Sequence, residues 1–239
     1  MNHKLDTSSI KAVVFDFDGT LARLNINFPA MRSSIRKLMT DFKIPVGEFT
    51  DLHILEMIDA GGVYLNELRP ADAAVFRSRA HELVTRMEIE AADEGALLDG
   101  TRMLLAELAS RSIRTGVVTR NCRIAVLKVF PDIARHCQAF LAREDTEHVK
   151  PHPEHLRSAL RVLGVIPAEA IMVGDHPLDI LLGRVTGTCT IGVLTGHSGR
   201  EDLCSANADL IIDKALDIIN IFKIQGHEKR HKGGPINET

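Results

Sequence analysis

The sequence predicts an α/β protein built on a Rossmann-like parallel sheet, with a helical domain inserted near its N-terminus. Three observations predict this fold. An apolar run over residues 12–15 is typical of a buried central strand, and it ends in two carboxylates, Asp16 and Asp18. From Leu97 onward, helical and strand patterns alternate. Between these parts, residues 24–92 show helical patterns throughout, which is typical of a small inserted bundle.

The composition is that of an ordinary globular protein. The chain has 239 residues and a formal net charge of −3, and no apolar stretch is long enough to span a membrane. Its four cysteines are scattered without a CxxC pair, which argues against a disulfide framework and against a zinc site. The N-terminus is polar and lacks the apolar core of a signal peptide. We therefore expect a cytoplasmic monomer or homodimer that binds neither nucleic acid nor membrane.

Apolar residues at helical spacing mark three helices in the inserted part. The first covers about residues 31–42, and the second covers about residues 51–60. We expect the second helix to end at Gly61-Gly62, because glycine pairs commonly terminate helices. The third helix begins near Pro70.

The part from Leu97 onward alternates between helices and strands. The expected helices cover residues 101–110, 122–130, 155–163, 178–185 and 214–222. The expected strands cover residues 114–118, 139–141, 171–174, 190–194 and 210–212. This order predicts a parallel sheet with helices on both faces. The charged segment 225–239 has no apolar face, and we expect it to be disordered.

Polar residues follow the strands at their carboxyl ends, where ligands bind in open parallel sheets. Asp16 and Asp18 lie one residue apart and therefore face the same side. Thr119 follows a second strand, and Asp175 follows a third, with Asp179 four residues further on. Carboxylates this close repel each other, so the site needs a cation or a bound proton.

Further residues complete the pattern of an anion site. Gly19 permits a sharp turn after the two acids, and Lys150 lies in a stiff loop that prolines bracket. Arg120 and Asn121 follow Thr119 at a helix start, where backbone amides bind phosphate. Carboxylates, a lysine and a hydroxyl suit an oxyanion that is held together with a cation, and oxygen ligands favour Mg²⁺.

In these residues the chain resembles the haloacid dehalogenase-like (HAD) phosphohydrolase superfamily. It is similar to the branch with a helical cap after the first motif, which includes phosphoglycolate phosphatase and β-phosphoglucomutase. The first motif, DxDGTL, matches residues 16–21, and the second, a hydrophobic run closed by Thr or Ser, ends at Thr119. The third, KPxP, matches residues 150–153, and the fourth, GDxxxD, matches residues 174–179. Each motif has modest specificity, but four in the right order form a strong signal.

The resemblance implies a domain organisation and an activity. The implied core consists of residues 1–22 and 94–224, and the implied helical cap consists of residues 23–93. The implied activity is Mg²⁺-dependent hydrolysis of a small phosphorylated metabolite, phosphoglycolate-like or a sugar phosphate, through an aspartyl-phosphate intermediate.

The resemblance also implies a role for each matching residue. Asp16 is the expected nucleophile, and Asp18 is the expected general acid and then base. Thr119 is expected to bind the phosphoryl oxygens, and Lys150 to neutralise charge between Asp16 and the phosphate.

Two groups of ligands follow from these roles. The expected Mg²⁺ site is formed by Asp16, Asp18 (through its backbone carbonyl), Asp175 and Asp179, and Asp179 is favoured as a brace for the other ligands. The expected substrate-binding residues are Gly19, Thr119, Arg120, Asn121 and Lys150.

Two alternative functions stay open within the same superfamily. A phosphomutase of the β-phosphoglucomutase type uses the same carboxylates, and a non-catalytic HAD-fold regulatory protein shares the fold. Regulatory members usually lose a motif residue, however, and this chain retains all of them. Asp18 argues against a dehalogenase, which does not need it, and against a phosphonate-cleaving enzyme, which usually lacks it. Response-regulator receivers carry their phosphoacceptor after a later strand and have no large helical insertion.

Overall fold

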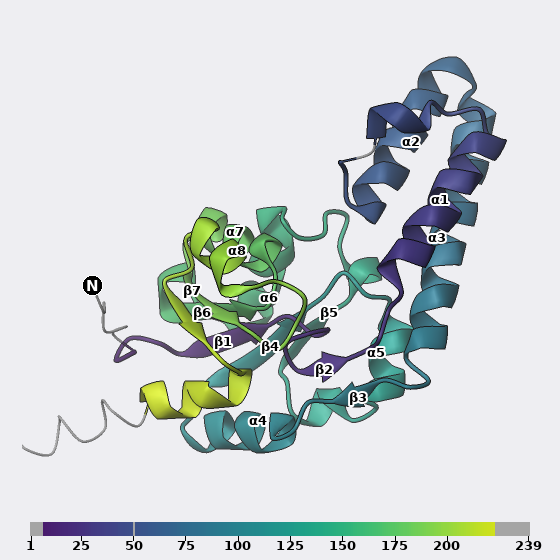
Figure 1. The fold of residues 1–239 in the computed structure, drawn as a ribbon. Helices are drawn as coiled ribbons and strands as arrows, with labels where there is room; N and C mark the ends of the chain where they lie inside the picture. Colours follow the sequence, from purple (N-terminus) through teal and green to yellow (C-terminus); the bar gives the residue numbers. More distant parts are fainter. Residues whose placement is uncertain (1–6, 50, 223–239) are drawn as a thin grey trace, which may run out of the picture. The chain divides into compact units, whose positions relative to one another are not determined.

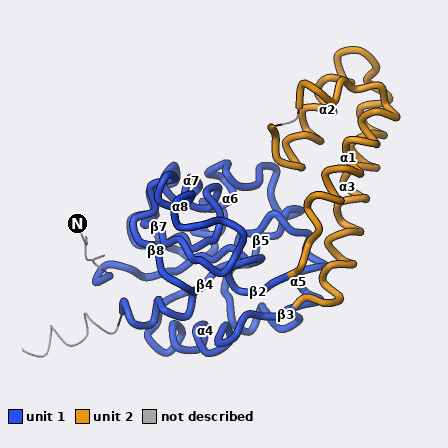
Figure 2. The backbone as a smooth tube through the Cα atoms, viewed as in Figure 1, with its two compact units in different colours: residues 1–23, 96–239 blue, residues 24–95 orange. Residues whose placement is uncertain are grey.

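The computed structural model describes residues 7–49 and 51–222, and the chain divides into two compact units (Figure 2). One unit combines the described residues up to Arg23 with those from Ala96 onward, and the other is residues 24–95. No helix in the described ranges is long and apolar enough to cross a membrane. The segment predicted to be disordered, 225–239, lies outside the described residues.

The larger unit is built on a six-stranded parallel sheet with the strand order β5-β4-β1-β6-β7-β8 (Figure 1). Its strands are β1 (Ala12–Phe15), β4 (Arg114–Val118), β5 (Ala139–Leu141), β6 (Ala170–Gly174), β7 (Cys189–Val193) and β8 (Leu210–Ile212). The central strands β1 and β6 are buried along their whole length, as expected for apolar runs covered on both faces. The predicted α/β class with a Rossmann-like sheet is confirmed.

Helices cover both faces of this sheet. The helices of the larger unit are α4 (Thr101–Ser110), α5 (Arg123–Val129), α6 (Pro153–Leu163), α7 (Pro177–Thr186) and α8 (Arg200–Ser205). Helix α6 packs on β1, β4 and β5, and α7 packs beside it on β6 and β7. Helix α4 contacts β4 from the opposite face (Figure 1). The short 3₁₀ helices of this unit are η2 (Ile133–Arg135), η3 (Arg143–Asp145), η4 (Pro167–Glu169) and η5 (Ala215–Asp217), and residues 218–222 continue η5 as a helix. A further one, η1 (Val46–Phe49), belongs to the smaller unit.

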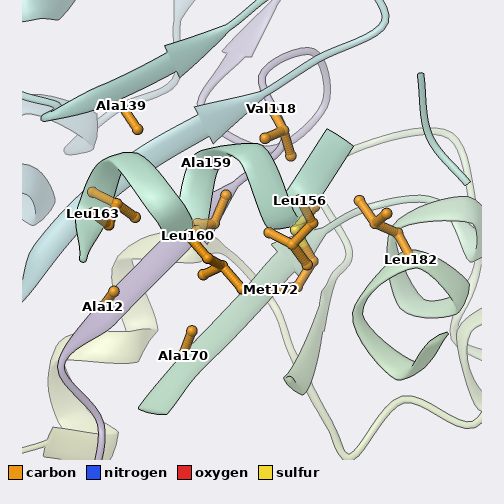
Figure 3. Packing of buried hydrophobic residues seen from close by; sticks show 11 residues of the cluster. Ala12, Val118, Ala139, Leu156, Ala159, Leu160, Leu163, Ala170, Met172 and Leu182 are labelled. Atoms are coloured by element: carbon orange, nitrogen blue, oxygen red, sulfur yellow. The ribbon is translucent and has the colours of Figure 1, made fainter. Parts of the chain in front are cut away.

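Helix α6 is fixed to the sheet by one apolar face. Leu156, Ala159, Leu160 and Leu163 follow the i, i+3, i+4, i+7 spacing of one helix face and point at the sheet together, where they meet Met172 of β6 (Figure 3). All five side chains are buried. This packing holds the N-terminus of α6, and therefore the loop before it, at a defined position over the strand ends.

The smaller unit is helical, with α1 (Phe28–Asp41), α2 (Ile54–Leu68) and α3 (Pro70–Ala91). The chain leaves the larger unit and returns to it through a two-stranded antiparallel ribbon, in which β2 (Ala22–Arg23) pairs with β3 (Ala96–Leu97). The sequence did not predict this ribbon, because two-residue strands are too short to give a periodic pattern.

The prediction that the second helix ends at Gly61-Gly62 was wrong, since α2 continues through both glycines. A Cβ at position 61 would lie 3.0 Å from the ring of Phe76, and one at position 62 would lie 2.3 Å from Nε of Arg77. Both contacts come from α3. The two glycines therefore permit close packing of α2 on α3 and do not end the helix.

Candidate active site

Three adjacent strands bring the motif residues to one edge of the sheet. Strand β1 pairs in parallel with β4 on one side and with β6 on the other. Asp16, Thr119 and Asp175 directly follow these three strands, so residues that are far apart in the sequence meet at the same carboxyl edge. The backbone N–H of Asp16 donates a hydrogen bond to the carbonyl of Val173 at 2.8 Å. The backbone hydrogen bonds between β1 and β6 thus continue as far as Asp16.

Lys150 contacts two of the carboxylates. Its Nζ lies 2.5 Å from Oδ1 of Asp16 and 2.7 Å from Oδ1 of Asp179, and 4% of its side chain is exposed. Burial alone would lower the pKa of Lys150, but the two carboxylates outweigh burial and leave this pKa raised. The ammonium is therefore charged and holds the two acids together.

One ammonium does not balance the negative charge of this cluster. Oxygens of Asp16, Asp175 and Asp179 lie within 4.8 Å of one another, and all three residues are buried. Burial, and then the charges of Asp179 and Asp175, raise the pKa of Asp16 well above its usual range, although Lys150 opposes the shift. Burial, and then Asp179, raise the pKa of Asp175 to about 6. The cluster therefore has more acidic groups than positive charges, and its acids offer oxygen ligands alone. Both properties fit a Mg²⁺ ion.

The fourth-motif aspartate Asp179 is held at both of its oxygens. Oδ1 accepts from Lys150, and Oδ2 accepts from the backbone N–H of His176 at 3.1 Å. These contacts favour the role of a brace over that of a direct metal ligand.

The carboxylate of Asp18 does not belong to the three-aspartate group, but its charge contributes to the raised pKa of Asp175. Asp18 therefore lies near the cluster without joining it through its side chain.

A loop after β7 holds Asp175, and this contribution was missed by sequence reasoning. Oδ2 of Asp175 accepts from the backbone N–H of His197 at 3.2 Å, and Oδ1 accepts from the hydroxyl of Thr20 at 3.4 Å. The hydroxyl of Thr195 donates to the carbonyl of Gly19 at 2.6 Å, which ties the loop to the first motif. Gly19 has φ +84°, and a Cβ there would lie 2.6 Å from the Asp175 carboxylate, so glycine is required. One feature of the sequence could have predicted this contact: the loop follows a strand of the same parallel sheet, so it lies at the same carboxyl edge as the acids.

The turn after β4 is held by its own side chains. The buried hydroxyl of Thr119 donates to Oδ1 of Asn121 at 2.8 Å and accepts from the backbone N–H of Asn121 at 3.2 Å. The guanidinium of Arg120 donates to the carbonyl of Lys150 at 2.8 Å. The side chains of Arg120 and Asn121 thus fix the turn and the lysine loop, and their binding of substrate stays a prediction.

Known proteins are similar to this chain in sequence or in fold. A family model described as haloacid dehalogenase-like hydrolase matches residues 10–187. Pyrophosphatase PpaX from Bacillus pumilus is 31% identical over 228 residues, covering 91% of this chain and 98% of the relative. Solved structures of other proteins share the fold. A predicted phosphoglycolate phosphatase from Haemophilus somnus is 19% identical, with a TM-score of 0.62 and coverage of 90% of this chain and 99% of that one. β-Phosphoglucomutase from Clostridium difficile is 17% identical, with a TM-score of 0.63 and coverage of 92% and 98%.

Replacing Lys150 by Met tests the balance of charge in the cluster. The change leaves the buried acids Asp16 and Asp179 without their ammonium, so we expect the free energy of unfolding in metal-free buffer near neutral pH to fall by about 3–5 kcal/mol. The pKa of Asp16 is already raised and rises further without Lys150. The folded variant therefore takes up a proton more readily than the wild-type protein on acidification, so its deficit is smaller at an acidic pH such as 5 than near neutral pH.

Denaturant unfolding of both proteins, followed by circular dichroism at the two pH values, measures this deficit. Lys11→Met is the matched control, because Lys11 is exposed and pairs with Glu169 at the surface. It should cost less than about 1 kcal/mol at either pH. An identical deficit for Lys150→Met at both pH values would contradict the charge balance described here.

Gly196→Ala tests how tightly the loop after β7 closes on Asp175. A Cβ at position 196 would lie 1.7 Å from Oδ2 of Asp175, so either the loop or the carboxylate must move. We expect the free energy of unfolding to fall by about 1–3 kcal/mol, which is the usual cost of overpacking. Gly199→Ala is the control in the same loop, because its Cβ would meet nothing closer than 3.7 Å. Equal stability of the two variants would refute the close approach.

Proposed function

The chain belongs to the haloacid dehalogenase-like hydrolases, and on this premise we propose that it is a Mg²⁺-dependent phosphatase that acts on a small phosphorylated metabolite through an aspartyl-phosphate on Asp16. One observation carries the proposal. The ammonium of Lys150 and the carboxylates of Asp16, Asp175 and Asp179 converge at the carboxyl edge of the sheet, where one positive charge faces three acidic groups. Such a cluster suits a cation together with a phosphate.

The first step transfers the phosphoryl group to the protein. An oxygen of Asp16 forms a bond to phosphorus while the bond from phosphorus to the leaving oxygen breaks. Asp18 donates a proton to that leaving oxygen, as a general acid. The ammonium of Lys150, 2.5 Å from Asp16, offsets the repulsion between the carboxylate and the phosphate.

The second step regenerates the enzyme. Asp18 takes a proton from a water molecule, and the water oxygen attacks phosphorus. The bond between Asp16 and phosphorus then breaks, which releases inorganic phosphate and restores the carboxylate. Thr119 is proposed to hold the phosphoryl oxygens during both steps, since it follows β4, the neighbour of β1.

The proposed metal ligands are Asp16, Asp175 and the backbone carbonyl of Asp18, with Asp179 as a brace or a further ligand. When bound, Mg²⁺ supplies positive charge that offsets the repulsion between phosphate and carboxylates. The raised pKa values of Asp16 and Asp175 support this assignment, because burial and then neighbouring carboxylates raise them, and a bound cation would oppose the shift.

The substrate class follows from the relatives and from the chemistry of the site. The relative from Bacillus pumilus is named a pyrophosphatase, and inorganic pyrophosphate would offer this site a phosphoryl group with phosphate as the leaving group. Phosphoglycolate and sugar phosphates offer the same group on a small organic molecule. We propose that the helical unit, residues 24–95, is the cap of this family. The four cysteines are free thiols, which supports the proposed cytoplasmic location.

Asp16→Asn tests the proposed nucleophile. The amide cannot attack phosphorus, so kcat should fall by about four orders of magnitude or more while the fold is retained. The assay measures phosphate release with Mg²⁺ from pyrophosphate, phosphoglycolate and a set of sugar phosphates, with and without a chelator. Asp213→Asn is the matched control, because the side chain of Asp213 is 85% exposed, and it should keep full activity.

The same assay separates the alternatives. Retained activity of Asp16→Asn would rule out the aspartyl-phosphate mechanism. Isomerisation of a sugar 1-phosphate without phosphate release would identify a phosphomutase. Absence of turnover by the wild-type protein across the whole panel would favour a regulatory protein.

A further inference from the structure

A buried histidine links the lysine loop to the sheet. His155 lies in the first turn of α6 and is fully buried. Its Nδ1 lies 3.2 Å from the backbone nitrogen of Lys150, and its Nε2 lies 3.2 Å from the carbonyl oxygen of Leu141 at the end of β5. The ring thus bridges two segments that are not neighbours in the sequence.

The two contacts of His155 assign its tautomer. The backbone N–H of Lys150 is a donor, so Nδ1 must accept, and the carbonyl of Leu141 is an acceptor, so Nε2 must carry the hydrogen. One neutral tautomer satisfies both bonds. A protonated ring would place an N–H at Nδ1 against the N–H of Lys150 and break that bond.

This histidine extends a hydrogen-bond chain between two predicted catalytic residues. The carbonyl of Leu141 also accepts from the backbone N–H of Thr119 at 3.0 Å. The chain therefore runs from Thr119 through Leu141 and His155 to the backbone of Lys150. The carbonyl of Lys150 accepts from Arg120, the residue after Thr119, at 2.8 Å. The backbone N–H and the backbone carbonyl of Lys150 are therefore both hydrogen-bonded to groups that connect them to Thr119 or its neighbour.

The lysine loop needs such an anchor. Pro151 and Pro153 follow Lys150, and neither has a backbone N–H to donate. The side chain of Lys150 is long, and its Nζ must reach two carboxylates at once. A shift of its backbone would move the ammonium away from Asp16.

We propose that His155 is a positioning residue that holds Lys150 in register with Thr119 through its Nε2–H tautomer. This inference rests on the proposed phosphatase function. His155 touches neither the three-aspartate group nor, in the proposed mechanism, the reacting atoms. It acts through the backbone of Lys150.

The surroundings of the ring keep it neutral. Burial, and then the charge of Lys150, lower the pKa of His155 to about 4. Arg120 acts in the same direction, whereas Asp145 and the hydrogen bond to Leu141 oppose the shift. The hydrogen-bond chain is therefore intact at neutral pH.

The kinetic test compares two replacements of His155. His155→Leu removes both hydrogen bonds, and we expect kcat to fall about 10- to 100-fold with a much smaller change in KM, since a displaced lysine affects the transition state most. His155→Asn keeps an acceptor near the position of Nδ1 and should recover part of this loss. In the Lys150→Met background, His155→Leu should lower kcat less than about twofold, because its effect runs through that lysine.

Controls separate positioning from general destabilisation. Leu108→Val changes a buried residue of α4, a helix that does not carry the lysine loop, and should lower the melting temperature while leaving kcat unchanged. An active wild-type protein whose His155→Leu variant keeps its kcat would overturn the role of His155 alone. An equal loss in the wild-type and Lys150→Met backgrounds would overturn it as well. An inactive wild-type protein would overturn the proposed function.

A spectroscopic readout is independent of activity. Long-range ¹⁵N–¹H NMR spectra distinguish the two neutral tautomers and the protonated ring, and the His155→Asn variant identifies the signals of His155. We expect the neutral Nε2–H form near neutral pH. The Nδ1–H form or a protonated ring would contradict the hydrogen-bond chain.

Discussion

The contact of Lys150 with Asp16 and Asp179 is the interaction on which the site depends. Burying like charges together is costly, and a fold tolerates it where opposite charge and hydrogen bonds compensate. Here one ammonium faces three clustered carboxylates, and the raised pKa values of Asp16 and Asp175 reflect the imbalance. The imbalance also explains the proposed chemistry. A site that is short of positive charge recruits a divalent cation, and the cation together with Lys150 allows an anionic phosphate to approach a carboxylate nucleophile.

The architecture supplies this contact from distant parts of the chain. Strand β1 lies between β4 and β6, so the first, second and fourth motifs meet at one edge of the sheet. The third motif arrives on the loop before α6, whose apolar face fixes that loop over the strands. Smaller contacts then set the positions of individual groups. The loop after β7 holds Asp175, and the backbone of Lys150 is held through His155 and Arg120. Each of these contacts joins segments that are separated in the sequence.

The sequence predicted the features that have a strong local pattern. The strands at 114–118 and 139–141 have the predicted bounds, because apolar runs and the polar residues that end them are visible in a short window. Asp16, Asp175 and Lys150 were predicted to lie together because the two acids follow strands and the lysine lies in a proline-bracketed loop, and Asp179 was added because it lies four residues after Asp175. The features that were missed depend on partners elsewhere. The pair Gly61-Gly62 indicated a helix end from the sequence alone. Its actual role, close packing of α2 on α3, depends on residues of α3 that lie elsewhere in the sequence. Likewise, the role of His155 depends on Leu141, which no local pattern connects to it.

The most direct test of the charge imbalance is a calorimetric titration of the metal-free protein with Mg²⁺ at about pH 6, in buffers of different ionisation enthalpy. We predict one ion per chain, bound with release of protons, because the ion lowers the raised pKa values of Asp16 and Asp175. We further predict that Asp175→Asn abolishes this binding and that the exposed control Asp213→Asn retains it. Absence of Mg²⁺ binding by the wild-type protein, or binding that Asp175→Asn leaves unchanged, would contradict this view of the site.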